Sequence, residues 1–276
     1  MKNKKRTKLT LLIASLSLFL AACSTSPITE ASTGFWDKGI IYNFSQFIVW
    51  LSEIFGSSYG MGIIIFTIIT RIVMLPLMYF QYKTTRATAI LQPKIKQLRE
   101  QYSSRDRETQ ARLQEEINAL YQREGVNQYA GCLPLLVQMP VMIALYQAIS
   151  RTEVLKTGTF LWLHLGSPDP YFVLPFLAAV FTFLTSWLTM KMQDTGGAGK
   201  LMLYFMPAMI FFISLSLPSA LALYWVVGNI FSAAQTLLMN NPFKFQAEQE
   251  ALAEAERQRK RALEKARQPR KKRNKR

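Results

Sequence analysis

The feature that most constrains this sequence is an apolar run, residues 59–80, whose single charge, Arg71, lies near its middle. The run is long enough to cross a bilayer, since a spanning helix needs about 20 residues. An arginine at the centre of such a helix costs about 2.5–3.5 kcal/mol, so it must face protein or water and is a candidate functional residue. The alternative is that Arg71 only pairs with a neighbouring helix. The other apolar runs, however, contain no Asp or Glu as a partner.

Four further apolar runs follow, and the hydrophobic and charged residues are separated along the chain at a net charge of +16. This separation is typical of a membrane protein with basic segments outside the bilayer. We predict an all-α polytopic membrane protein whose core is residues 59–240. Its five transmembrane helices would be residues 59–80, 132–149, 170–190, 201–217 and 219–238.

Residues 1–22 have the features of a targeting segment: a basic start, an apolar stretch and small residues before Cys23. The sequence around Cys23 resembles the lipobox of bacterial lipoproteins. The resemblance implies that Cys23 becomes the lipidated first residue of the mature chain on the outer face. Ordinary cleavage or an uncleaved anchor are the alternatives.

Residues 23–58 are predicted to form a short tether and then an amphipathic helix. Such a helix could lie on the outer membrane surface or pack on the bundle, or do both. Its apolar side would consist of Ile40, Phe44, Phe47, Ile48, Leu51 and Phe55.

A polar segment separates the first two apolar runs, and we predict a helical hairpin at residues 83–124. Gly125 would cap its second helix. The two apolar stripes that would face each other are Leu91, Ile95, Leu98 and Tyr102, and Leu113, Ile117 and Leu120.

The tail, residues 241–276, carries thirteen Lys or Arg against five Glu. Residues 247–267 favour a helix, and the end is predicted to be disordered. By the positive-inside rule, the hairpin and the tail are cytoplasmic and the N-terminus is outside. The basic residues at the extreme end are Arg270, Lys271, Lys272, Arg273, Lys275 and Arg276.

Two motifs resemble the YidC family of membrane protein insertases, part of the YidC/Oxa/Alb group. One is Gly125-Val126-Asn127 followed by residues 131–140, and the other is residues 69–77 around Arg71. The resemblance covers about residues 35–240. The lipoprotein signal is similar to the Gram-positive branch of the family, and the long basic tail resembles its paralogue that works with translating ribosomes.

The resemblance implies an insertase and chaperone that places, folds and assembles new integral membrane proteins in the bacterial cytoplasmic membrane, with lipoproteins as a further class of substrate. The five spans would surround a hydrophilic groove, with Arg71 as its positive charge. Gln138 is a candidate groove wall, and Trp225 matches an aromatic position that faces substrate. The weaker candidates, whose hydroxyls could equally bond their own backbone, are Thr67, Thr70, Ser186 and Ser232.

The partners that the resemblance implies are nascent membrane proteins, the ribosome, the Sec translocon and the signal recognition pathway. The tail could bind ribosomal RNA, lie on anionic membrane lipids, or only determine topology. The hairpin could be a docking platform or a cap over the groove.

Other classes of protein fit this sequence less well. A transporter is expected to show inverted repeats or acidic residues inside its apolar runs, and this sequence shows neither. An enzyme would call for a nucleophile motif or a metal-ligand cluster. We therefore expect no enzymatic activity, no cofactor and no metal. A chaperone that holds spans while they pack overlaps with the insertase.

Overall fold

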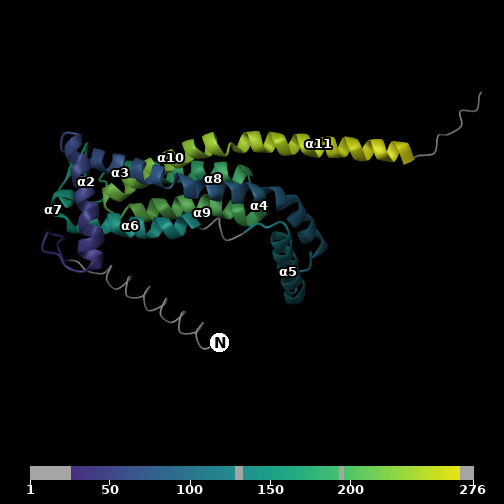
Figure 1. Cartoon of the computed structure of the whole chain (residues 1–276), viewed down its shortest axis with the longest axis horizontal. Coiled ribbons are helices and arrows are strands. Elements are labelled where there is room, and N and C mark those ends of the chain that lie inside the picture. Colours follow the sequence, from purple (N-terminus) through teal and green to yellow (C-terminus); the bar gives the residue numbers. More distant parts are fainter. Residues whose placement is uncertain (1–25, 128–132, 193–195, 268–276) are drawn as a thin grey trace, which may run out of the picture.

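A computed structural model describes residues 26–127, 133–192 and 196–267, and these residues are mostly helical. The helices α3, α6, α8, α9 and α10 lie side by side along one axis, α2 crosses one end of them, and α5 and the far part of α11 project from the other end (Figure 1). Within the described residues, β1 and β2 pair as a two-stranded antiparallel sheet. The elements are η1 (Phe35–Tyr42), α2 (Asn43–Ile54), α3 (Tyr59–Val73), α4 (Leu75–Gln101), α5 (Arg107–Arg123), α6 (Leu133–Arg151), α7 (Glu153–Lys156), β1 (Thr159–Phe160), β2 (Leu163–His164), α8 (Val173–Met192), α9 (Gly196–Ser214), α10 (Ser219–Met239) and α11 (Pro242–Arg267).

The predicted first span divides at Met74 into α3 and α4. Pro76 lies in the first turn of α4, where its missing N–H costs least. From there α4 continues to Gln101 without a loop. The part of the predicted span after Met74 and the first helix of the predicted hairpin therefore form one continuous helix.

The main core lies between α3, α6, α8 and α10, and α2 covers one end of it. α8 packs against both α9 and α10, and α10 packs against α3. Among the fully buried side chains are Ile63, Leu145, Ile149 and Tyr224. Close van der Waals packing of these side chains holds the helices together, because burial of apolar surface gains little for helices that lie in lipid.

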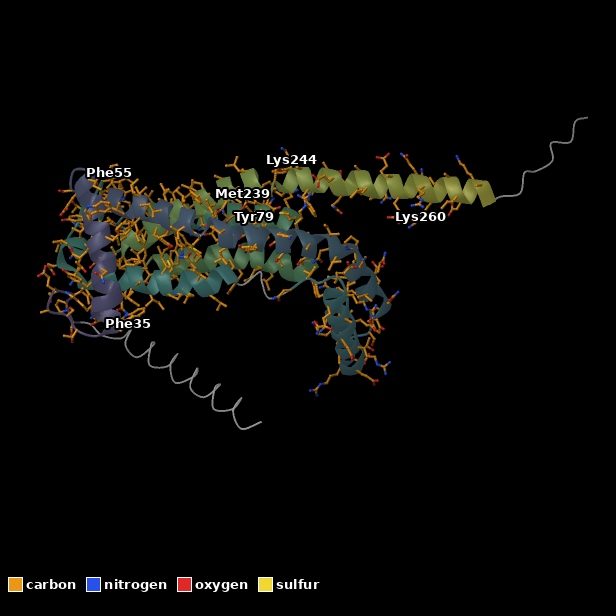
Figure 2. All side chains as sticks on the ribbon, viewed as in Figure 1. Phe35, Phe55, Tyr79, Met239, Lys244 and Lys260 are labelled. Atoms are coloured by element: carbon orange, nitrogen blue, oxygen red, sulfur yellow. The ribbon has the colours of Figure 1, made fainter. Side chains whose placement is uncertain are left out.

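The predicted amphipathic helix crosses the end of the bundle, because the pair Phe35–Ile54 and Tyr59–Val73 is bent by 114°. Ile48 and Leu51 of the predicted stripe are buried, whereas Phe47 and Phe55 stay exposed. A side chain at Gly62 would overlap the hydroxyl of Ser52, so the crossing needs glycine there. Figure 2 shows Phe35 and Phe55 at this end and Lys260 on the far part of α11.

A partly buried ion pair fixes η1 on the bundle. Arg151, at the end of α6, places its Nη2 2.6 Å from the carboxylate of Asp37. Arg151 also donates to the carbonyl of Ser26 and to the side chain of Gln147, which accepts from Trp36 as well. This network ties the chain before η1 to the end of α6.

The same end of the bundle is covered by the segment between α6 and α8. Ser219, which begins α10, donates its hydroxyl to the carbonyl of His164 and its N–H to that of Ser167. Asp169 is buried and accepts from Trp162 and from the N–H of Leu174 at the start of α8. The turn between α9 and α10 is therefore hydrogen-bonded to the segment between α6 and α8.

The segment between α3 and α6 is a helical hairpin of α4 and α5. Its buried cluster is Leu91, Ile95, Leu113 and Ile117, taken from the two stripes that the sequence places face to face. Gly125 has a φ of +65°, the conformation that favours glycine. Val126 N–H bonds the carbonyl of Tyr121 and Gly125 N–H that of Gln122, which is a Schellman cap.

Two helical segments of the described residues are long and apolar enough to cross a membrane, Val173–Met192 and Ser219–Ala266. The bent pair Phe35–Ile54 and Tyr59–Val73 adds a third only if it counts as one span. Leu201–Ser214 is apolar but shorter. The break at Met74 leaves α3 with 15 residues, fewer than a straight span requires. The count of five spans stays a prediction.

Candidate functional site

Arg71 lies in the last turn of α3 and points at α10. Its guanidinium carbon is 5.9 Å from the centre of the Tyr224 ring, a cation–π distance. The Nε atom of Arg71 is buried and has no hydrogen-bond partner among the described residues. No carboxylate of that part of the chain forms an ion pair with Arg71. The charge therefore lies inside the bundle without a described anionic partner.

Tyr224 connects Arg71 to α6. Its side chain is buried, and its hydroxyl accepts a hydrogen bond of 2.6 Å from Nε2 of Gln138. The structure thus brings Arg71 and Gln138, two residues selected from the sequence, to the same tyrosine. Polar groups of α3, α6 and α10 converge there.

Gly228, one turn after Tyr224, gives Arg71 its space. An added Cβ at Gly228 would lie 2.5 Å from Nη2 of Arg71. Tyr224 and Gly228 are followed along α10, at further steps of four residues, by Ser232 and Thr236. Each of these hydroxyls donates to the carbonyl four residues earlier. Residues four apart share a helix face, so small and polar groups line the side of α10 near Arg71.

A second tyrosine extends this polar line toward α4. The hydroxyls of Tyr82 and Thr236 share a hydrogen bond at 3.4 Å. The polar line therefore runs from Gln138 past Arg71 to the base of α4.

The remaining sequence candidates lie in different surroundings. Thr67 is fully buried and donates to the carbonyl of Ile63, while Thr70 donates to that of Thr67. Ser186 is half-buried on α8. Trp225 is half-buried against the main core. Backbone bonding accounts for the hydroxyls of Thr67, Thr70 and Ser232, and a groove role for any of these residues stays a prediction.

Sequence reasoning did not select Tyr224, Gly228 or Asn229. Tyr224 and Gly228 could have been found from their four-residue spacing with Ser232, which places all three residues on one face of a helix. Asn229 donates from its amide to the hydroxyl of Thr182 at 2.9 Å and so links α10 to α8. Its signal was an amide side chain inside an apolar run.

Some predicted sites lie outside the described residues. These are the signal segment 1–22, Cys23 and the basic end of the tail, residues 270–276. The described residues contain no group of three or more His, Cys, Asp or Glu that could hold a metal ion.

Comparison with known proteins gives consistent matches. A family model described as "60Kd inner membrane protein" matches residues 50–248. The chain is 55% identical to "Membrane protein insertase YidC" of Pediococcus pentosaceus over 253 residues, 91% of each chain. It is 54% identical to the protein of the same name from Enterococcus faecalis, covering 99% of this chain and 98% of that one. The "Membrane protein insertase YidC 2" of Listeria innocua is 52% identical over 96% of this chain and 95% of that protein.

A solved structure is similar in fold. It is described as "Active YidC insertase crystal structure with the first transmembrane domain resolved", and it matches with a TM-score of 0.60 at 29% identity. The match covers 73% of this chain and 46% of the solved chain, so the matched part spans less than half of that protein's length.

Proposed function

This chain belongs to the YidC family of membrane protein insertases, and from that premise we propose that Arg71 is the charge that draws polar segments of a new membrane protein into the bundle. The observation that carries the proposal is the position of Arg71 between α3 and α10. It contacts Gly228 and Tyr224, and its Nε has no described acceptor. A cation held in this way remains available to an acidic or polar substrate group.

The proposed mechanism follows from the cost of crossing the bilayer. Polar flanks of a substrate must pass about 30 Å of hydrocarbon. A polar, hydrated groove partway through shortens this path, and a fixed charge in a low-dielectric surrounding attracts the flank strongly. The apolar span of the substrate then moves sideways into lipid, driven by its own transfer free energy. No covalent step and no cofactor is required.

The proposed groove involves five spans: α3 with the start of α4, then α6, α8, α9 and α10. These helices lie in one bundle (Figure 1), which supports the arrangement. The α2 end is covered by loops bonded to Ser219, which supports a site closed on that side. The charged hairpin and α11 lie at the other end, which we propose is cytoplasmic by the positive-inside rule. The N-terminus, lipidated at Cys23, would then be outside.

The partners are proposed on the same basis. Substrates are nascent membrane proteins, which the chain inserts alone or with the Sec translocon and assists in folding. The basic tail would bring ribosomes to the bundle, with anionic lipid as its other candidate ligand. The signal recognition pathway would deliver substrates to the hairpin.

Insertion of a single-span substrate into proteoliposomes tests the role of Arg71. The wild type is compared with Arg71→Lys and Arg71→Ala at equal amounts of folded protein, on one substrate with an acidic outer tail and one with a neutral tail. We expect Arg71→Ala to reduce insertion of the acidic substrate by about tenfold, which corresponds to about 1.4 kcal/mol. Arg71→Lys should retain most of it, and the neutral substrate should be affected less. Equal insertion by all three proteins would exclude the attraction mechanism and favour a packing role for Arg71.

A further inference from the structure

A cavity of about 530 Å³ lies between α4, the end of α8 and the start of α11, well separated along the chain from Arg71. Figure 1 shows these three helices together at the end from which α5 and the far part of α11 project. On α4 the cavity is lined by Gln92, Lys96 and Arg99, which follow one another at steps of four and three residues. Such spacing places them on one face of the helix. On α11, Gln246 and Gln249 form the facing wall in the same way.

The floor of this cavity is apolar. Ala89, Met192 and Phe245 form a small buried cluster that joins the three helices. Two polar contacts hold the walls around the floor. Arg86 forms an ion pair with Glu248 and lies over the ring of Phe245. Gln246 donates from Nε2 to the carbonyl of Lys191 at 2.7 Å.

The rim of the cavity is positively charged. It is lined by Lys96, Arg99 and Lys191, and by one carboxylate, that of Glu250. None of the three cations forms an ion pair with a described residue. Lys191 instead lies 5.5 Å from the ring of Trp187. The rim can therefore receive an anion without breaking a described ion pair.

Two further features suit a ligand that carries hydroxyl groups. Pro93 has no N–H, so the carbonyl of Ala89 in the cavity wall loses its usual helical donor. The side-chain amides of Gln92 and Gln249 offer both donors and acceptors. A ligand with a phosphate and hydroxyls would find partners for both.

The position of the cavity indicates where this ligand comes from. Lys191 lies in the last turn of α8, an apolar helix of spanning length, so it lies where the helix leaves the hydrocarbon. On the topology proposed above, this level is the cytoplasmic headgroup region. We propose that the cavity is a binding site for the headgroup of an anionic phospholipid, with its phosphate at Lys96, Arg99 and Lys191. The apolar floor would contact the glycerol end of the acyl chains.

Native mass spectrometry of the full chain tests this proposal by counting the phosphatidylglycerol and phosphatidylcholine molecules that stay bound after detergent exchange. The cavity variant is Lys96→Gln/Arg99→Gln/Lys191→Gln. The control, Arg105→Gln/Arg107→Gln/Arg259→Gln, removes the same charge from residues that do not line this cavity. Gln249→Trp narrows the cavity without changing its charge.

We expect the wild type and the control to retain phosphatidylglycerol in preference to phosphatidylcholine. The cavity variant and Gln249→Trp should lose this preference by roughly tenfold, because basic residues near anionic lipid each add to its binding. Equal loss in the cavity variant and the control would overturn the proposal, since the lipid would then bind any basic surface. Displacement of the lipid by an equal concentration of inorganic phosphate would also overturn it, because the site would then recognise phosphate alone. This readout needs no insertion assay, so its failure would leave the insertase function intact.

Discussion

The guanidinium of Arg71 occupies the space in which any other residue at position 228 would carry a side chain. A Cβ at Gly228 would lie 2.5 Å from Nη2 and 3.2 Å from Cζ of Arg71. The end of α3 therefore approaches α10 with a charged group between the two helices. The missing side chain of Gly228 makes room for the charge inside the bundle.

Gly228→Ala should displace Arg71 without unfolding the protein. Alanine favours a helix over glycine by up to about 1 kcal/mol, and the atom it meets is the flexible end of a side chain. We expect insertion of an acidic-tailed substrate to fall while the thermal unfolding temperature stays equal or rises. Ala234→Val, on an exposed position of the same helix, is the control. Insertion by Gly228→Ala at the wild-type level would show that insertion does not depend on the exact position of the Arg71 guanidinium.

Tyr224 and Gln138 should be energetically coupled. Tyr224→Phe removes the acceptor of the 2.6 Å bond and leaves the Gln138 amide without it. Loss of a partner for such a group costs about 1–3 kcal/mol, whereas removal of both partners costs less. Thermal or denaturant unfolding of Tyr224→Phe, Gln138→Leu and the double variant measures the coupling, which we expect at about 1 kcal/mol. If the changes in the free energy of unfolding of the two single variants add up to that of the double variant, Tyr224 and Gln138 are not coupled through this bond.

The tip of the hairpin should loosen in acid. The Asp106 carboxylate caps α5 by accepting from the Thr109 N–H at 2.8 Å and from the Ser104 hydroxyl, and these bonds hold the pKa of Asp106 well below its ordinary value. A group with a depressed folded pKa stabilises above its unfolded pKa, about 3.9, and loses that effect as the pH falls through the folded value. The protection of the Thr109 amide, which is the intrinsic exchange rate divided by the observed rate at the same pH, should therefore decrease below about pH 4 in the wild type.

Asp106→Ala provides the comparison for this acid effect. It should show low protection of the Thr109 amide at every pH, because the cap is absent throughout. The exchange of Ile117 in the same helix serves as the internal reference. Identical pH profiles for the two proteins would rule out the cap as the titrating group.

Ribosome binding by the tail should depend on its far part. Deletion of residues 257–276 removes twelve of the thirteen basic residues after position 240 and spares the start of α11, which packs on α8. We expect weaker co-sedimentation with ribosomes and a shallower dependence on salt, because fewer phosphate contacts form. Deletion that changes binding to anionic vesicles but not to ribosomes would assign the tail to lipid instead.

Local features of this fold could be predicted from the sequence. The facing stripes of the hairpin, with Leu91 and Ile95 on one helix and Leu113 and Ile117 on the other, follow from helical periodicity. The cap at Gly125 follows from the conformation that only glycine adopts easily. The break near Pro76 follows from its missing N–H. Each of these signals lies within a few residues of the structure it determines.

The surroundings of Arg71 could not be predicted in this way. The structure places Tyr224 against Arg71, whereas its neighbour Trp225 is half-buried against the main core, and the role toward substrate that the resemblance implies for Trp225 stays a prediction. Consecutive residues differ by about 100° around a helix, so which of Tyr224 and Trp225 faces Arg71 depends on how α10 is rotated in the bundle. That rotation is set by packing against α3 and α8.

The sequence by itself determined that this chain has apolar helices, a polar helical hairpin, a basic tail and one charge inside an apolar run, because periodicity, capping and hydropathy are local properties. Only the tertiary structure decided that Arg71 meets Gly228 and Tyr224, that Arg151 pairs with Asp37, and that α4, α8 and α11 enclose a basic cavity. These contacts join residues far apart in the chain. They depend on the relative rotation and depth of whole helices, which close packing of the complete core fixes.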